Sequence, residues 1–211
     1  MDFEAARARL INHLSTEIRD KQVLAAMSRV PRERFVPAEE QCLAYEDRPL
    51  PIGLDQTISQ PFIVALMTEA MELTGDEKVL EVGTGSGYQA AILAELARHV
   101  VTTERMPVLA EAAKRALDSL GYTNIEVHLA EETLGWQRGA PYDRIIVTAG
   151  APQIPADLLA QLAVNGLMVI PVGSYYVQEL YKVSKQKRKN IVQNLCGCRF
   201  VSLIGKGAWE E

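Results

Sequence analysis

Residues 79–96 of the chain read VLEVGTGSGYQAAILAEL. An aliphatic run leads into a segment in which three of five residues are glycine, and a helical pattern follows at once. Glycine allows the backbone to turn tightly and to approach a ligand closely, while the first N–H groups of a helix lack backbone partners. The stretch therefore predicts a strand, a nucleotide-type loop and a helix in direct succession.

On both sides of this stretch, short aliphatic runs alternate with helical patterns. The expected strands cover 78–82, 99–103, 124–129, 143–149 and 167–172, and the expected helices between them cover 88–97, 107–120 and 155–162. Strands of this composition, separated by helices, are typical of a parallel sheet with both faces covered. The sequence therefore predicts an α/β fold with a doubly wound, mostly parallel sheet.

The pattern changes at both ends of this region. Beyond it, segments 178–185 and 191–204 have no helix between them, so we expect an antiparallel hairpin at one edge of the sheet. The run KQKRKN that joins them is expected to be a solvated turn rather than a basic binding patch. Before the alternating region, residues 3–14 and 20–28 have the pattern of short amphipathic helices. Residues 45–60 have the pattern of an ordered loop.

Composition limits the classes of protein to which the chain can belong. Its 211 residues, 48% of them hydrophobic and 23% charged, suit one compact unit with a sizeable core. The formal net charge of −5 argues against a general nucleic-acid surface, and no apolar run approaches the length of a membrane span. The charged N-terminal stretch MDFEAARARLINHL lacks the apolar core of a signal peptide. Because Cys42, Cys196 and Cys198 are too few and too poorly spaced for a disulfide framework or a zinc site, we expect no metal and a reduced, cytoplasmic setting.

Two acidic residues bear on which ligand the glycine loop would bind. Gly85, Gly87 and Ala90 fit the dinucleotide pattern G-x-G-x-x-G/A, and Glu104 follows about 20 residues later, so an NAD-dependent enzyme is one interpretation. Against it stands Glu81, just before the first glycine. A carboxylate there would repel a pyrophosphate by about 4 kcal/mol at ~4 Å and an effective dielectric constant of ~20.

The same carboxylate suits the cationic amine and sulfonium of S-adenosylmethionine, and Glu104 would then bind the ribose. Taken singly, Glu81 could be a solvated strand end and Glu104 a helix-capping acid. They stand, however, at the C-terminal ends of successive strands, where open α/β sheets bind ligands. We therefore expect S-adenosylmethionine rather than NAD.

Motifs along nearly all of the chain point to one family. They are VPRERFVP, AYEDRPLPIG, QTISQP, VLEVGTGSGYQAAILA, APYDRIIVTAGAPQIPADLLAQL, VIPVG and RFVSLIGKGAW. With these motifs the chain resembles the protein-L-isoaspartate O-methyltransferase family, which belongs to the class I S-adenosylmethionine-dependent methyltransferases. Many methyltransferases share the glycine loop, whereas TISQP and YDRIIVTAGAPQIP are far more specific to this family.

The resemblance adds detail to the expected fold. It implies a seven-stranded, Rossmann-like methyltransferase sheet with an antiparallel C-terminal edge hairpin and a small N-terminal helical subdomain. We expect residues 1–60 to hold that subdomain and an active-site lid. Residues 61–211 would form the Rossmann-like methyltransferase domain, and the two parts would make one compact unit.

The resemblance also implies a reaction: methyl transfer from S-adenosylmethionine to the free α-carboxylate of an L-isoaspartyl residue in a damaged protein or peptide, with S-adenosylhomocysteine as co-product. The ester then cyclises to a succinimide, which hydrolyses in part to aspartate. Because a carboxylate is already ionised at neutral pH, the transfer needs alignment and exclusion of water rather than a general base. His13, His99 and His128 are accordingly expected to be structural. The expected partners are isoaspartyl proteins and peptides. We expect the protein to be a monomer that binds neither nucleic acid nor a membrane.

Residues 55–61, DQTISQP, allow two interpretations. Pro61 suits the first position of a helix, and Ser59 or Gln60 could cap its free N–H groups. The resemblance makes the same loop an active-site lid in which the Ser59 hydroxyl lies beside the methyl group and the incoming carboxylate. The two interpretations are compatible because a helix N-terminus favours a carboxylate. Ser59 is thus the candidate catalytic residue.

The resemblance places further contacts around this lid. The donor contacts would be Thr57, Ile58, Ser59, Glu81, Gly83, Thr84, Gly85, Ser86, Gly87, Glu104, Arg105, Glu131 and Glu132. The substrate contacts would be Tyr45, Ile58, Ser59, Pro171, Val172 and Gly173. The peptide cleft would then lie between the lid, the Tyr45 region and the turn at 171–173.

The chain departs from the family pattern in three places. Ala130, Glu131 and Glu132 stand where the family has Gly-Asp-Gly, whose acid contacts the adenine amino group; Glu131 keeps an acceptor, so we expect adenine still to be bound. Asp55 replaces a glycine, which puts a charge into the lid and removes a flexible residue. Ser202 replaces a proline, with little expected consequence. These changes leave open a family member that methylates another carboxylate, and a weakly active binder of isoaspartyl peptides.

Overall fold

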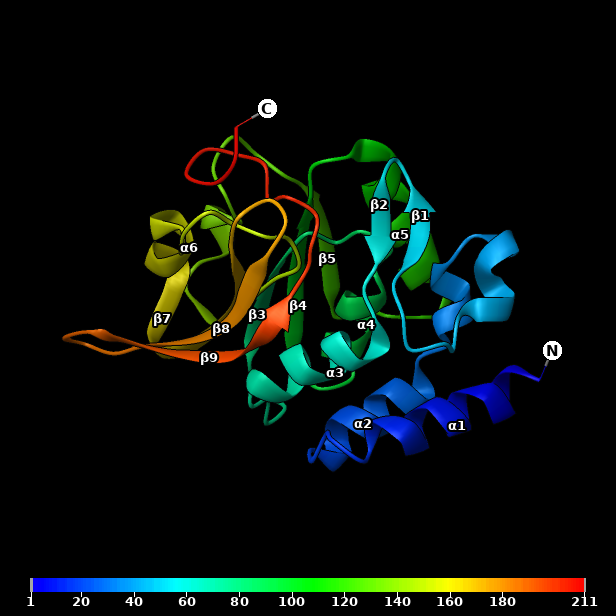
Figure 1. Ribbon diagram of the computed structural model, residues 1–211. Coiled ribbons are helices and arrows are strands. Elements are labelled where there is room, and N and C mark those ends of the chain that lie inside the picture. The colour runs from blue at the N-terminus through cyan, green and yellow to red at the C-terminus, as the bar shows by residue number, and fades with distance from the viewer. Residues whose placement is uncertain (1, 211) are drawn as a thin grey trace.

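The computed structural model describes residues 2–210 and builds them around one twisted sheet (Figure 1). Within that range the sheet has seven strands in the order β5-β4-β3-β6-β7-β8-β9. In chain order they are β3 (Lys78–Val82), β4 (His99–Glu104), β5 (Ile125–Leu129), β6 (Tyr142–Val147), β7 (Leu162–Gly173), β8 (Gln178–Lys185) and β9 (Asn190–Cys198). The strands from β5 to β7 pair in parallel, and β8 and β9 continue the sheet in antiparallel pairs. The predicted fold class is confirmed.

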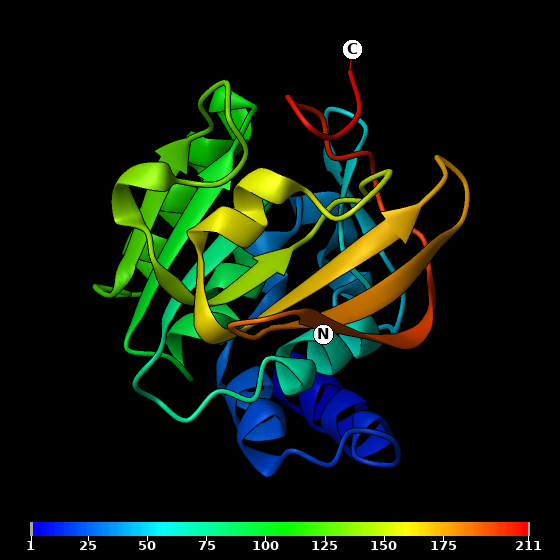
Figure 2. The ribbon, with the colours of Figure 1, turned by 90° about the vertical axis from the view of Figure 1, so that its left-hand side faces the viewer.

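Side chains alternate between the two faces of the sheet, and helices cover both faces. Leu80 of β3 packs in one core cluster with Leu158 of α6 (Ala156–Gln161), whereas Val79 packs in another with Leu93 of α4 (Tyr88–Ala94). Figures 1 and 2 show α6 on one side of the sheet and α4 with α5 (Pro107–Ser119) on the other. The apolar strands are thus buried on both sides, which is why they have almost no polar alternation.

The N-terminal part packs against this layered body through a shared core. Its helices are α1 (Phe3–Leu14), α2 (Lys21–Arg29) and the 3-10 helices η1 (Arg32–Phe35) and η2 (Ala38–Leu43). The next helix along the chain is α3 (Pro61–Ala70), and the 3-10 helix η3 (Gln137–Gly139) lies between β5 and β6. The side chain of Asp20 caps α2 by accepting from the Gln22 amide at 2.8 Å. One core cluster joins Met27 of α2 to Tyr88 of α4. The division of the chain at residue 60 stays a prediction.

The segment 45–60, which the sequence predicts to be a loop, contains a β-hairpin. Its strands are β1 (Leu50–Gly53) and β2 (Gln56–Ile58), paired antiparallel. The two connecting residues, Leu54 and Asp55, have φ values of +53° and +57°. Positive φ at both central residues is the conformation of a type I′ hairpin turn, and aspartate adopts it more readily than most residues. Asp55 therefore occupies a position where the glycine expected from the family pattern would fit without strain.

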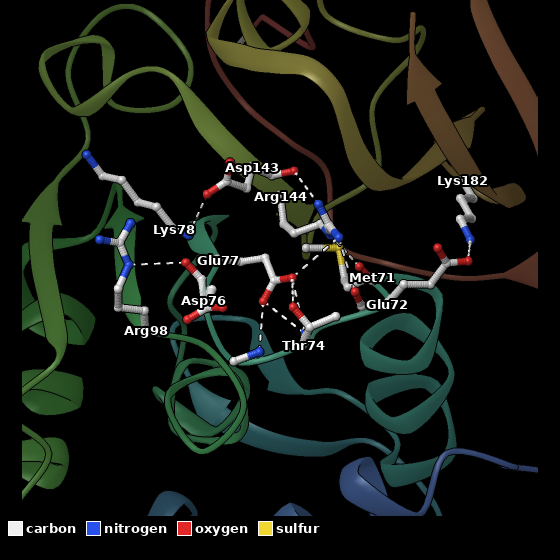
Figure 3. Close-up of polar contacts among 11 residues, drawn as sticks. Met71, Glu72, Thr74, Asp76, Glu77, Lys78, Arg98, Asp143, Arg144 and Lys182 are labelled. Carbon is white, nitrogen blue, oxygen red and sulfur yellow. Dashed lines mark hydrogen bonds and ion pairs between the residues drawn. The ribbon is translucent and has the colours of Figure 1, made fainter.

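A polar cluster closes the opposite end of the sheet, where β3 begins (Figure 3). The carboxylate of Glu77 accepts from the amide and hydroxyl of Thr74 and from the amide of Gly75, over 2.8–3.1 Å. It also pairs with Arg144 of β6 at 3.5 Å, and the Arg144 guanidinium donates to the Met71 carbonyl at the end of α3 at 2.5 Å. The cluster ties the end of α3 to two central strands. In the described part of the chain, no helix is long and apolar enough to cross a membrane.

Candidate active site

A cavity lies at the C-terminal ends of β3, β4 and β6. Its walls come from residues 56–59, the glycine loop after β3, residues 130–135 except Glu132, and residues 201–205. The chain runs from β3 outward through β4 to β5 and then returns to β6 on the other side of β3, so the strand order reverses at the cavity. Open α/β sheets bind their ligands at such a point.

The glycine loop has the backbone conformation that its composition predicts. Gly83, Gly85 and Gly87 have φ values of +102°, +53° and +89°. A Cβ on Gly83 would collide with the hydroxyl of Thr148, which donates to the Gly83 carbonyl at 2.5 Å. Residues 83–86 line the cavity as predicted for the donor site. Gly87 does not line it; this residue begins α4 in the left-handed conformation and packs against α5.

Glu81 is fully buried at the floor of the cavity. Its Oε2 accepts from the hydroxyl of Thr102 at 2.6 Å, and that hydroxyl lies 2.6 Å from the hydroxyl of Thr84. Its Oε1 has no hydrogen-bond partner within residues 2–210. Burial, with a smaller contribution from the nearby charge of Glu104, raises the pKa of Glu81 to about 8 although the Thr102 hydroxyl opposes the shift. The solvated strand end that was one interpretation of Glu81 is therefore excluded.

Glu104 connects the glycine loop to the start of α5. Its Oε2 accepts from the Gly85 amide at 2.8 Å and its Oε1 from the Met106 amide at 3.0 Å, beside the N-terminus of the helix. The Glu104 side chain therefore accepts from a backbone amide at the start of α5 and also lines the cavity. Arg105, the next residue, lines the cavity as well. Each carboxylate oxygen can accept a second bond, so Glu104 keeps the capacity to bind ribose hydroxyls.

The lid residues Thr57, Ile58 and Ser59 line the cavity opposite the sheet. Pro61 begins α3 as predicted. The prediction that Ser59 or Gln60 caps this helix is wrong, because Asp47 caps it. One oxygen of Asp47 accepts from the Phe62 amide at 2.8 Å, and the other accepts from the Gln60 side chain at 3.0 Å.

A buried arginine holds the backbone of this lid. Arg32 of η1 donates from Nη2 to the Ser59 carbonyl at 2.9 Å and from Nε to the Ala44 carbonyl at 2.8 Å. Its guanidinium lies 4.9 Å from the ring centroid of Tyr88, which lines the cavity. Burial lowers the pKa of Arg32. Its Nη1 has no hydrogen-bond partner in the part of the chain that the structure describes.

The segment after β5 carries the acidic pair that replaces Gly-Asp-Gly. Glu131 lines the cavity, where its carboxylate accepts from Arg138 at 2.7 Å, whereas Glu132 is exposed and lies outside the lining. Arg138 lies 5.2 Å from the ring centroid of Trp136, on which His128 stacks at 4.0 Å. The donor contact predicted for Glu131 is compatible with this position, whereas Glu132 does not line the cavity.

Four of the predicted substrate contacts, Tyr45, Pro171, Val172 and Gly173, do not line the cavity. The Tyr45 hydroxyl accepts from Arg7 at 2.7 Å and donates to Glu33 in the N-terminal part. Residues 171–173 end β7 and pair with Ala151, two residues beyond Ala149 of the cavity wall. Of the predicted substrate contacts, Ile58 and Ser59 are at the cavity, and the others could touch only parts of a substrate that remain outside it.

Sequence reasoning missed several parts of the wall, among them residues 133–135 and the two segments that follow. Thr148 and Ala149 follow β6 directly, so their place at the C-terminal edge of the sheet could have been inferred from the strand pattern. Residues 201–205 come from the chain that follows β9, and Ser202 forms a bridge with Gly150. No periodic pattern in the sequence predicts that the chain after β9 comes back to the cavity. Ser202 stands in the cavity wall, and the expectation that its difference from proline has little consequence stays a prediction.

The residues of the cavity fit S-adenosylmethionine. A fully buried carboxylate oxygen without a partner among residues 2–210 is the counterpart that a cationic amine requires, and the carboxylate of Glu104 lies beside the loop for a ribose. The positive φ values of the glycine loop keep side chains away from the space beside it. Within residues 2–210, no group of His, Cys, Asp and Glu side chains could hold a metal ion.

Comparisons with known proteins agree with this site. The model of the protein-L-isoaspartate(D-aspartate) O-methyltransferase family matches residues 5–208. A protein-L-isoaspartate O-methyltransferase of Geobacter metallireducens is 52% identical over 99% of this chain and 98% of its own length, and one of Dictyoglomus turgidum is 52% identical over 100% and 98%. A solved protein-L-isoaspartate O-methyltransferase superposes with a TM-score of 0.87 at 27% identity, over 96% of this chain and 67% of its own. A Plasmodium falciparum relative, solved in complex with S-adenosyl-L-homocysteine, gives 0.80 at 25% identity, over 95% and 99%. The chain therefore belongs to the protein-L-isoaspartate(D-aspartate) O-methyltransferase family.

Proposed function

We propose that the protein transfers a methyl group from S-adenosylmethionine to the α-carboxylate of L-isoaspartyl residues in damaged proteins and peptides. The observation that carries this proposal is the buried, unpartnered Oε1 of Glu81 within residues 2–210, set in a glycine-lined cavity whose far wall is the Ser59 lid. The first feature suits a cationic donor, and the second would bring the Ser59 hydroxyl close to an incoming carboxylate. Family membership supplies the isoaspartyl substrate.

The chain's contribution is orientation and exclusion of water. S-adenosylmethionine, when bound, supplies the methyl group on its sulfonium. Glu81 would accept the hydrogen bonds of the donor's amine and Glu104 those of its ribose, while the loop from Gly83 to Ser86 keeps its backbone close. These contacts would hold the donor in one orientation beside the lid.

The acceptor carboxylate needs no base, because it is ionised at neutral pH. Ser59 would orient it by donating from its hydroxyl, and the N-terminus of α3 and the cation of Arg32 behind the lid make the surroundings electropositive. A closed lid also removes water that would compete for the methyl group. The methyl ester then cyclises to a succinimide without further help from the chain, and hydrolysis returns part of it to aspartate.

The test compares two synthetic peptides that differ only by isoaspartate or aspartate at one position, each incubated with donor labelled in the methyl group. We expect label on the isoaspartyl peptide alone, released as methanol on standing, and competition by S-adenosylhomocysteine but not by NAD. Label on neither peptide, with S-adenosylhomocysteine still bound, would overturn the substrate assignment and favour another peptide carboxylate or a binding-only protein. Binding of NAD in its place would overturn the donor assignment.

The setting of the reaction belongs to the same proposal. We propose a monomeric enzyme of the cytoplasm that acts on polypeptides and takes no nucleic acid as partner. The net charge of −5 and the reduced cysteines support it. Tyr45 and residues 171–173 would contact the substrate only outside the cavity.

A further inference from the structure

The turn between β7 and β8 exposes three large apolar side chains in succession. Tyr175 is 49% exposed, Tyr176 76% and Val177 65%. We call these three residues the aromatic ledge. Single exposed apolar residues are common on protein surfaces, but a contiguous group is typical of an interaction site.

The turn that carries the aromatic ledge is fixed by its own hydrogen bonds. The Ser174 hydroxyl accepts from the amides of Tyr176 and Val177 at 3.3 and 3.2 Å, and the Ser174 amide donates to the Val177 carbonyl at 2.9 Å. The buried side chain of Gln178 donates to the Ser174 carbonyl at 2.5 Å and accepts from the Phe200 amide at 2.8 Å. A partner would therefore meet side chains that are already positioned, which lowers the entropic cost of binding.

The aromatic ledge is connected directly to the wall of the active-site cavity. Tyr175 stacks on Trp209 with ring centroids 3.8 Å apart. Trp209 donates from its indole to the Gly150 carbonyl and from its amide to the Leu203 carbonyl, both at 3.0 Å, and Leu203 lines the cavity. Figures 1 and 2 show the β7–β8 turn beside the C-terminal segment, at the end of the sheet that also carries the β1–β2 hairpin.

A polypeptide substrate gives this arrangement a use, on the premise that the proposed function holds. Only the isoaspartyl residue enters the cavity, so the residues on either side of it must lie along the rim. We propose that the aromatic ledge binds an apolar side chain that flanks the isoaspartyl residue and thereby sets a sequence preference. A second copy of the chain is the weaker candidate occupant, because three side chains offer far less than the roughly 800 Å² per partner of a stable interface.

The test uses two isoaspartyl peptides, one with leucine and one with serine on both sides of the isoaspartate. The wild type should methylate the leucine peptide with a kcat/KM about tenfold higher, mainly through KM, as expected for burial of a medium-sized apolar side chain. The double variant Tyr176→Ser, Val177→Ser should reduce that preference to less than about threefold, with unchanged affinity for S-adenosylhomocysteine. Both side chains are largely exposed, so the fold should tolerate their loss.

Val164→Ser is the matched control. Val164 is 50% exposed and lies near the start of β7, the strand that leads into the aromatic ledge. This position is at the end of the sheet away from the cavity, so the variant should keep the wild-type preference. Equal preference in the wild type and the double variant, with both peptides methylated, would overturn the proposal while leaving the proposed function intact. A double variant that changes only the oligomeric state would overturn it as well and would favour a second copy as the occupant. Methylation of neither peptide by the wild type would count against the proposed function itself.

Discussion

At the scale of single residues, Glu81 shows how burial changes the meaning of a sequence position. On the sequence alone, Glu81 is expected to carry a charge that repels a pyrophosphate. In the structure it is fully buried, and its raised pKa of about 8 means that the free protein holds it mostly protonated at neutral pH. The selection of a cationic donor then has a different physical basis: the donor's amine stabilises the ionised carboxylate, so binding should expel a proton.

Proton release on donor binding should therefore be measurable. At pH 7 a carboxyl group with a pKa of about 8 is protonated in about 0.9 of the free molecules, so close to one proton should leave for each S-adenosylhomocysteine bound. The sign follows from the raised pKa, because the ligand binds the deprotonated form and its affinity rises with pH until Glu81 is ionised in the free protein. Calorimetric titration in buffers of different ionisation enthalpy gives the number of protons.

The variant Glu81→Gln cannot lose that proton, so the release should disappear and donor affinity should fall. Glu46→Gln, which changes an exposed carboxylate of an ion pair with Arg48, should leave both quantities unchanged. Release that persists in Glu81→Gln would assign the proton to another group and remove Glu81 from donor binding.

At the scale of elements, the sequence was informative wherever local pattern and burial agree. The expected limits of β3, β8 and α1 agree with the structure, because apolar residues recur there in a pattern typical of a short strand or an amphipathic helix. The glycine loop was equally predictable, since its conformation depends on the glycines themselves. Residues such as Glu81 and Glu104 could be located because parallel strands place their C-terminal ends at one edge.

Elements that lack a typical local signal or depend on distant partners could not be predicted in this way. The β1–β2 hairpin turns at Leu54 and Asp55, and neither position holds the glycine that is typical of such a turn. The wall at 201–205 has its position because Gly150 and Trp209 hold it, contacts that no local pattern reveals. The helix cap came from Asp47, more than ten residues before α3, although Ser59 and Gln60 stand at the helix itself.

The cluster around Glu77 gives a stability prediction at the same scale. Glu77→Gln presents an amide group to the donors of Thr74 and Gly75 and removes the charge that pairs with Arg144. We expect a loss of about 2 kcal/mol in the free energy of unfolding at pH 7, measured by urea denaturation. The exposed control Glu46→Gln should change it by less than about 0.5 kcal/mol. Equal small changes in both variants would show that the cluster does not stabilise the junction.

The pH dependence of the same difference checks its cause. Burial disfavours the charge of Glu77, but the hydrogen bonds from Thr74 and Gly75 outweigh it and hold the pKa of the carboxyl below its ordinary value. A group whose pKa is lowered by folding stabilises the protein above its unfolded pKa of about 4.3, and this contribution is lost as pH falls through the lower folded value. The gap between wild type and Glu77→Gln should therefore narrow in that acid range. A gap independent of pH would indicate a packing effect instead.

At the scale of the whole molecule, the two ends of the sheet differ in what they do. The end at which β3 begins is closed by paired charges that tie α3 to the central strands. The other end carries the glycine loop, the lid, the C-terminal wall and the aromatic ledge, and the cavity lies among them. This end of the sheet can therefore hold a methyl donor in the cavity and a polypeptide along its rim, as a repair methyltransferase requires.

Conversion of isoaspartate to aspartate is the measurement that tests this account most directly. A peptide that contains only isoaspartate at one position is incubated with the protein, with and without S-adenosylmethionine, and both isomers are separated and quantified over repeated turnovers. The account predicts that isoaspartate declines and aspartate accumulates only when the donor is present. An isoaspartyl peptide that stays unchanged with the donor present and bound would contradict it.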